Sequence, residues 1–179
     1  MPVRALLIAF VFALVAGGGV AHADKVSKKF AGQILTSDKK FPNSAKSAGA
    51  YISKLQKQKK AKFWEDKEKH EWNIYIACFF KKPLSDLEYT IKFLDDQGRL
   101  LGTPFEQYTD SNSQTSVISS VTLDRKTFGV NRRVKIVLEQ GGRIMASGKF
   151  QILGEAEHYS GKVDFSEDDA NGGDDKDKE

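Results

Sequence analysis

The stretch from Trp72 to Leu153 constrains the fold most, because short runs of β-branched and aromatic residues recur there between turn signals. The first run, 72–80, is apolar on both faces of an extended chain, which is typical of a strand that is covered on both sides. The second run, 87–93, alternates apolar and polar residues, the pattern of a strand with one face in water. Further runs at 99–108, 117–123, 134–138 and 144–152 predict about six strands in all.

The connections between these runs indicate how the strands pair. Asp95 to Gly98 and the pair Gly141-Gly142 fit tight reversals, because glycine accepts the positive φ that short hairpin loops need. Gly102 and Pro104 predict a bulge or a sheet edge within 99–108, and residues 124–129 fit a turn or a short helix. No connection has room for a crossover helix, so the strands should pair antiparallel.

We therefore predict a mostly β fold, an antiparallel immunoglobulin-like sandwich of about six or seven strands with one N-terminal helix. A small open β-barrel is the alternative. Residues 24–62 form a basic segment with one more strand at 32–36. In the same segment, Pro42 to Ser44 can begin a helix in which Ala48, Ile52 or Tyr51, and Leu55 recur at helical spacing. The β domain is placed at 63–163 and an acidic tail at 164–179.

The first 23 residues have the parts of a secretory signal peptide in their usual order. Arg4 is followed by an apolar run, by three glycines and by Ala21-His22-Ala23. The apolar run is too short for a membrane-spanning helix, which takes about 20 apolar residues. We predict cleavage between Ala23 and Asp24, and thus an exported protein, periplasmic or extracellular, with no transmembrane anchor after processing. The short A-x-A ending favours a bacterial source.

Charge is divided along the chain, although the formal net charge is only +4. Residues 24–62 hold eleven lysines and two aspartates, residues 63–163 are balanced, and residues 164–179 hold eight acidic residues and two lysines. The tail has almost no apolar residue after Phe165, so it should be disordered.

The densest positive charge is a group of lysines that we call the lysine cluster: Lys54, Lys57, Lys59, Lys60 and Lys62. Such groups attract polyanions through salt-sensitive contacts, and the aromatic residues Tyr51, Phe63 and Trp64 lie beside this one. We predict it as the binding surface for a protein or for a polyanion such as lipid head groups, acidic polysaccharide or extracellular DNA. A solvated helix face is the alternative. The absence of arginine from the cluster argues against specific nucleic-acid binding.

The sequence shows no reaction chemistry. Cys78 is the only cysteine and lies in an apolar run, so a buried thiol is expected. His70 and His158 have no second ligand at metal-binding spacing, and no G-x-S-x-G elbow occurs. We expect no enzyme activity, no metal and no cofactor, and predict an exported interaction module. The alternatives are a structural or assembly component of an envelope or matrix, whose exposed strand edge pairs with another chain, and last a small hydrolase.

Overall fold

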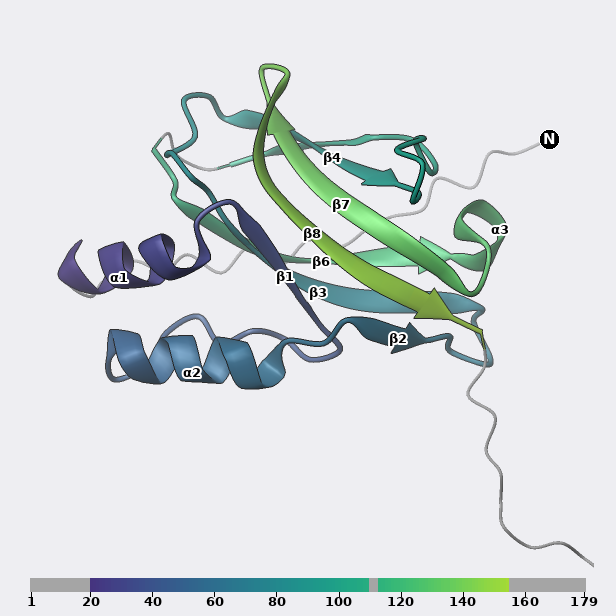
Figure 1. The fold of residues 1–179 in the computed structure, drawn as a ribbon, viewed down its shortest axis with the longest axis horizontal. Coiled ribbons are helices and arrows are strands. Elements are labelled where there is room, and N and C mark those ends of the chain that lie inside the picture. Colours follow the sequence, from purple (N-terminus) through teal and green to yellow (C-terminus); the bar gives the residue numbers. More distant parts are fainter. Residues whose placement is uncertain (1–19, 110–112, 155–179) are drawn as a thin grey trace, which may run out of the picture.

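The computed structural model describes residues 20–109 and 113–154 (Figure 1). Most of the predicted signal peptide, His158 and the predicted acidic tail lie outside these residues. The described chain is mostly β, with helices α1 (Val20–Phe30), α2 (Ala48–Gln58) and α3 (Arg125–Phe128). The strands are β1 (Gln33–Ser37), β2 (Lys62–Trp64), β3 (Glu71–Phe79), β4 (Glu88–Leu94), β5 (Phe105–Tyr108), β6 (Ser116–Asp124), β7 (Arg132–Gln140) and β8 (Arg143–Leu153).

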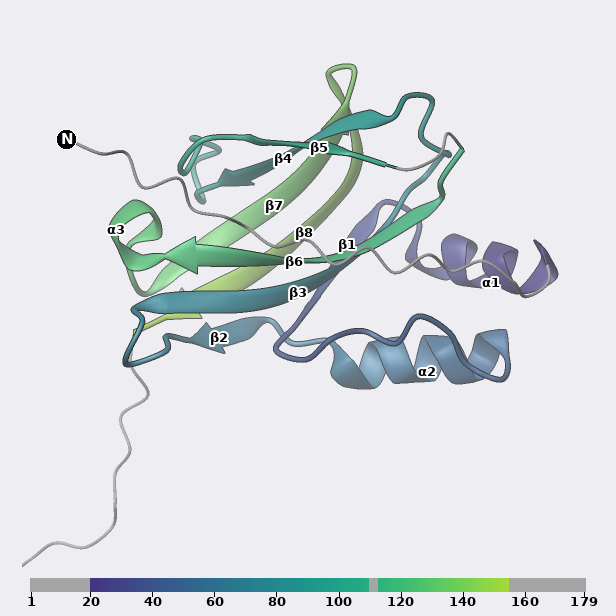
Figure 2. The ribbon, with the colours of Figure 1, turned by 180° about the vertical axis from the view of Figure 1, so that it is seen from behind.

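All eight strands belong to one sheet in the order β5-β4-β7-β8-β1-β3-β6, and β2 also pairs with β8. The sheet curls into a half-barrel, so that β3 and β6 pass below β7 and β8 (Figures 1 and 2). Where β1 meets β8, a Cβ on Gly148 would collide with the carbonyl oxygen of Ile34. Glycine is therefore required at the point where these two strands come closest.

The predicted immunoglobulin-like sandwich is not confirmed, because the strands form one continuous curled sheet, which fits the open-barrel alternative. The prediction of wholly antiparallel pairing is wrong for β8, which pairs parallel with β1 at Ser147 and with β2 over 151–153. β1 lies within the N-terminal segment, and β2 spans the end of that segment and the start of the predicted β domain. Their direction is therefore not set by a hairpin turn, and the argument from short connections did not apply to them.

The predicted strands are confirmed in position, with differences at their ends. The 99–108 strand begins only at Phe105, because Gly102 takes a φ of 69° and Pro104 has no N–H to donate. The predicted helix is confirmed as α2, but Ser47 caps it in place of Ser44, with its Oγ accepting the Ala50 N–H at 3.2 Å. α1 and β2 were not predicted.

Two apolar cores lie on opposite sides of the sheet. The first is inside the curl and includes Trp72 and Cys78, both of which are buried. The second lies on the outer face of β1 and β3, where Val26 and Phe30 of α1 and Leu55 of α2 cover it. β3 is thus covered on both sides, as its sequence predicts, and the predicted buried thiol is confirmed.

Candidate functional site

The lysine cluster lies on α2, on β2 and on the link between them. Lys54 and Lys57 are on the exposed side of α2, Lys59 and Lys60 follow the helix, and Lys62 begins β2. The Nζ of Lys60 lies 2.7 Å from Oδ2 of Asp38, so its charge is already paired. The other four of the five predicted lysines have no ion-pair partner in the described part of the chain.

The link between α2 and β2 is held by backbone contacts with β1 and β8. Thr36 donates its Oγ1 proton to the Lys60 carbonyl at 2.6 Å, and the Lys60 N–H donates to the Thr36 carbonyl at 2.7 Å. The Gln151 N–H donates to the Ala61 carbonyl at 2.7 Å. These bonds place Lys62 in register with β8.

The outer face of the sheet extends this positive charge beyond the predicted cluster. Lys62 pairs with Gln151, which pairs with Arg133 on the other side. Two residues along the same strands, Lys149 pairs with Lys135. Their neighbours in sequence, such as Phe63, Val134 and Phe150, point into the first core, so the charged side chains face outward.

We call Lys62, Arg133, Lys135 and Lys149 the basic face. Neighbouring strands are about 4.8 Å apart and residues two apart along a strand about 7 Å, so Arg133, Lys135 and Lys149 are close neighbours. Lys62 lies about 10 Å from Arg133, because Gln151 of β8 stands between them. None has a carboxylate at ion-pair distance within 20–109 and 113–154. Glu139 lies on the same side of β7, but it pairs with Lys92. Trp64, 52% exposed, lies two residues from Lys62 on the same face.

Sequence reasoning missed three of these four residues. The signal was available, because Arg133 and Lys135 alternate with Val134 and Ile136 in the predicted strand. What the sequence could not show was the register, which brings Lys62 of β2 onto the same face as residues 71 to 87 positions later. A search for dense runs of charge ranks Arg133, Lys135 and Lys149 below the lysine cluster, because they are not grouped in the sequence.

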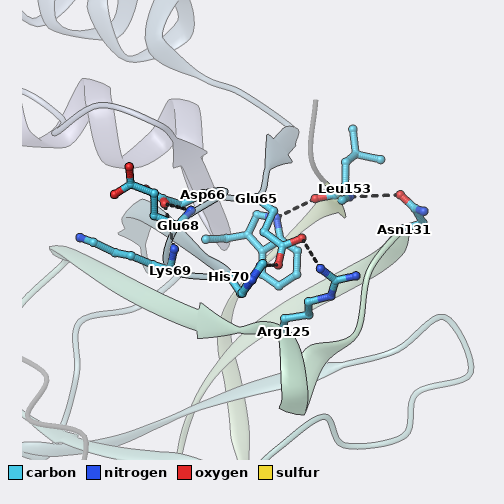
Figure 3. A network of polar contacts seen from close by, with 10 residues as sticks. Glu65, Asp66, Glu68, Lys69, His70, Arg125, Asn131 and Leu153 are labelled. Carbon is cyan, nitrogen blue, oxygen red and sulfur yellow. Dashed lines mark hydrogen bonds and ion pairs between the residues drawn. The ribbon is translucent and has the colours of Figure 1, made fainter. Parts of the chain in front are cut away.

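A second polar group lies at one end of the sheet (Figure 3). The side chain of Glu65, which follows β2, has no exposed surface. Its Oε1 lies 3.3 Å from His70 Nδ1 and its Oε2 3.5 Å from Arg125 Nη1. Neither oxygen accepts a hydrogen bond from the described residues. The buried Glu65 side chain thus lies between the half-exposed side chains of His70 and Arg125.

Backbone bonds around Glu65 connect four elements. The Leu153 carbonyl accepts the Glu65 N–H at 3.1 Å and the Trp72 indole N–H at 2.9 Å. The Arg125 N–H donates to the His70 carbonyl at 3.0 Å. These bonds join the ends of β2 and β8 to the starts of β3 and α3. We therefore assign the residues around Glu65 a structural role, which accounts for their arrangement without a catalytic reaction.

The turn between β2 and β3 completes this group. Asp66 Oδ1 accepts the N–H of Glu68 at 3.0 Å and of Lys69 at 3.1 Å. His70 follows with a φ of 55°, a left-handed conformation that few residues other than glycine adopt. Among the residues that the structure describes, no group of three or more histidine, cysteine or acidic side chains could hold a metal ion.

Gln140 organises a shallow depression of about 450 Å³ near the start of β4. Its Oε1 accepts the Ser85 N–H at 2.8 Å, and its Nε2 donates to the carbonyls of Asp86 and Glu88 at 2.9 and 3.1 Å. Since the amide is fully used in joining the end of β7 to the β3–β4 connection, we assign it a structural role.

Comparisons of the sequence matched no model of a known protein family and no curated protein. Within the described parts of the chain, no helix has the length and apolar character needed to cross a membrane.

Proposed function

We propose that this chain is an exported, non-enzymatic interaction module that binds a polyanion through its basic face. The observation that carries the proposal is the register that gathers Lys62, Arg133, Lys135 and Lys149 on one face of the sheet with no carboxylate partner among the described residues. The backbone positions of Arg133, Lys135 and Lys149 lie about 5–8 Å apart, which is within the Debye length of about 8 Å at physiological salt, so their charges repel one another in the free protein. Lys62 lies about 10 Å from Arg133, across Gln151, and extends the same positive surface. A bound polyanion would relieve that repulsion and release its own counterions.

The shape of the surface favours a polymer over a small ligand. The basic face covers β2, β8 and β7, which are neighbouring strands of the sheet. Their ribbons can be followed in Figure 1. Lys54, Lys57 and Lys59 offer a second group of cations on and after α2, which a long anion could also reach. Trp64 adds an exposed aromatic ring beside Lys62, suited to stack on a sugar. We therefore place acidic polysaccharide of an envelope or matrix first among the ligands.

Export to the periplasm or the cell exterior is part of the proposal and rests on the signal sequence. The predicted cut between Ala23 and Asp24 falls within α1. Val26 and Phe30, the α1 residues buried in the second core, both follow the cut, so processing would leave that core intact. N-terminal sequencing of the exported protein tests this step: a chain beginning at Asp24 is expected, and one still beginning at Met1 would contradict it.

The binding proposal is tested with a quadruple variant in which each residue of the basic face becomes glutamine. Its matched control changes four exposed lysines elsewhere to glutamine, namely Lys67, Lys69, Lys82 and Lys126, so that the net charge is the same. Binding to immobilised dextran sulfate, a linear sulfated polysaccharide, is measured as the salt concentration rises. Emission from the exposed Trp64 reports contact at the face itself.

We expect the basic-face variant to lose most of its affinity and to lower the slope of log K against log salt by about one for each contact removed. The control should remain close to the wild type, because none of its lysines belongs to the basic face. Equal losses in the two variants would show that only net charge matters, and the proposed site would then be wrong.

A further inference from the structure

β6 is an edge strand that lacks the usual protection against pairing. It lies at one end of the sheet, next to β3 (Figure 2), and its nine residues contain no lysine, arginine or proline. Its only charged residue is Asp124, the last. Edge strands of monomeric proteins are generally short or carry charges and prolines that prevent pairing. β5, at the opposite end, has these features: it has four residues, contains Glu106 and follows Pro104.

The hydrogen-bond phase of β6 shows which groups its free edge presents. The Phe80 N–H donates to the Thr115 carbonyl at one end of the β3–β6 ladder, and the Arg125 N–H donates to the His70 carbonyl at the other. Bonded pairs alternate along an antiparallel ladder, so the odd-numbered residues of β6 face β3. The even-numbered residues, including Ile118, Ser120 and Thr122, therefore direct their N–H and C=O groups away from the sheet, where no described strand pairs with them.

We infer that this edge pairs with the same edge of a second copy of the chain, antiparallel about a two-fold axis at Ser120. Ser120 then lies opposite Ser120 of the second copy, and Ile118 lies opposite Thr122. In this register each outward N–H between Ile118 and Thr122 meets a carbonyl of the partner strand. The inference goes beyond the proposed function and does not depend on it.

A second copy fits this edge better than an unrelated strand for two reasons. The central residues Ser119 and Ser120 are small and uncharged, so the strand meets itself without repulsion or crowding. Pairing of β6 with β6 is also closed, since the opposite end of the strand order in each copy is the protected β5 edge. A finite dimer results, whereas pairing of β6 with a different edge would continue into a fibre.

Sedimentation of the purified protein, expressed from the full-length sequence, tests the dimer over a range of concentrations in 1 M salt. Backbone bonds should survive high salt, unlike contacts between charged surfaces. Ser120→Lys places two lysines opposite each other and should raise the dimer dissociation constant by about fivefold or more. Ser120→Thr, which keeps a small β-forming side chain, is the matched control and should remain dimeric.

Cysteine cross-linking tests the register and does not depend on how the lysine variant folds. In Ser120→Cys the two cysteines would have Cα atoms about 5.5 Å apart, within the range of a disulfide. In Thr122→Cys they would be about 14 Å apart, because each lies opposite Ile118. Mild oxidation should cross-link only the first variant, since the native Cys78 is buried.

Three results would overturn the inference. The first is a wild type that stays monomeric at all concentrations, even if its edge pairs with a strand of another protein. The others are a dimer that Ser120→Lys leaves unchanged and equal cross-linking of the two cysteine variants.

Discussion

Replacing Gly148 with alanine should destabilise the protein by about 1–3 kcal/mol, the usual cost of forcing an extra methyl group into a packed site. A Cβ at this position would collide with the Ile34 carbonyl oxygen and would lie 3.1 Å from the Ile34 Cβ. The first of these neighbours is backbone, so it cannot rotate away as a side chain could. β1 or β8 has to move, and the Gln33–Ser147 pairing beside it should weaken.

Gly49→Ala is the matched control. A Cβ at Gly49 has nothing within 4 Å, and the residue lies in α2, where alanine is preferred over glycine by about 0.8–1 kcal/mol. The same change should therefore stabilise the protein at Gly49 and destabilise it at Gly148. Urea unfolding followed by the fluorescence of the buried Trp72 measures the free energy of unfolding of both variants. In a thermal unfolding experiment, the melting temperature should shift by about 2–4 °C for each kcal/mol.

A Gly148→Ala variant as stable as the wild type would refute this reasoning. It would also bring into question structural features beyond the contact between Gly148 and Ile34. β1 and β2 both pair in parallel with β8. The close approach of β1 to β8 therefore helps to determine where β2 pairs. If that close approach were absent, the alignment of Lys62 with Gln151 and Arg133 would lose its support. The proposed basic face would then have to be reconsidered along with the sheet order.

Three further predictions concern buried and paired groups. Arg125→Ala leaves the buried Glu65 carboxylate with fewer cations, so it should cost about 1–3 kcal/mol in urea unfolding, and adding Glu65→Leu should recover most of that loss. Burial raises the pKa of Cys78 to about 12, so iodoacetamide at pH 8 should label the native protein no faster than it unfolds; rapid labelling would contradict the buried position. The hydrogen bond from Lys60 lowers the pKa of Asp38 below 3.8, so this pair stabilises the fold above that pH and loses its effect as the pH falls through the lowered pKa. Lys60→Gln should therefore destabilise the protein at pH 6 by up to about 1 kcal/mol and by less at pH 3.

The strands of the fold could be predicted where their pattern is long enough to repeat. β3, β4 and β7 each show several apolar residues two apart, and the sequence located them to within a few residues. β2 has three residues, too few to show a period, and its sequence Lys-Phe-Trp merges with the lysines before it. The parallel pairing with β8 depends on where the chain returns after α2, and local pattern does not specify that.

Among the polar residues, too, some could be predicted from the sequence and others could not. Lys62 was found because it lies in a dense run, whereas Arg133 and Lys149 became candidates only through the register of β7 with β8. Glu65 gave no signal at all, because a glutamate after a lysine-rich segment is normally exposed. Its burial results from the closing of the β2–β3 turn by Asp66 and from the side chains of His70 and Arg125 around it.

The basic face and the β6 edge occupy different parts of one sheet, so the two proposals are compatible. β1 and β3 separate β8 from β6 in the strand order, and pairing through β6 would cover none of the four cations of the basic face. A two-fold dimer would instead carry two such faces. Since linked sites bind a long ligand more tightly than either site alone, a dimer would gain affinity for an extended polyanion and none for a short one. Edge pairing would thus favour binding to a polymer surface over binding to free anions, and this selectivity is what a module associated with an anionic envelope or matrix requires.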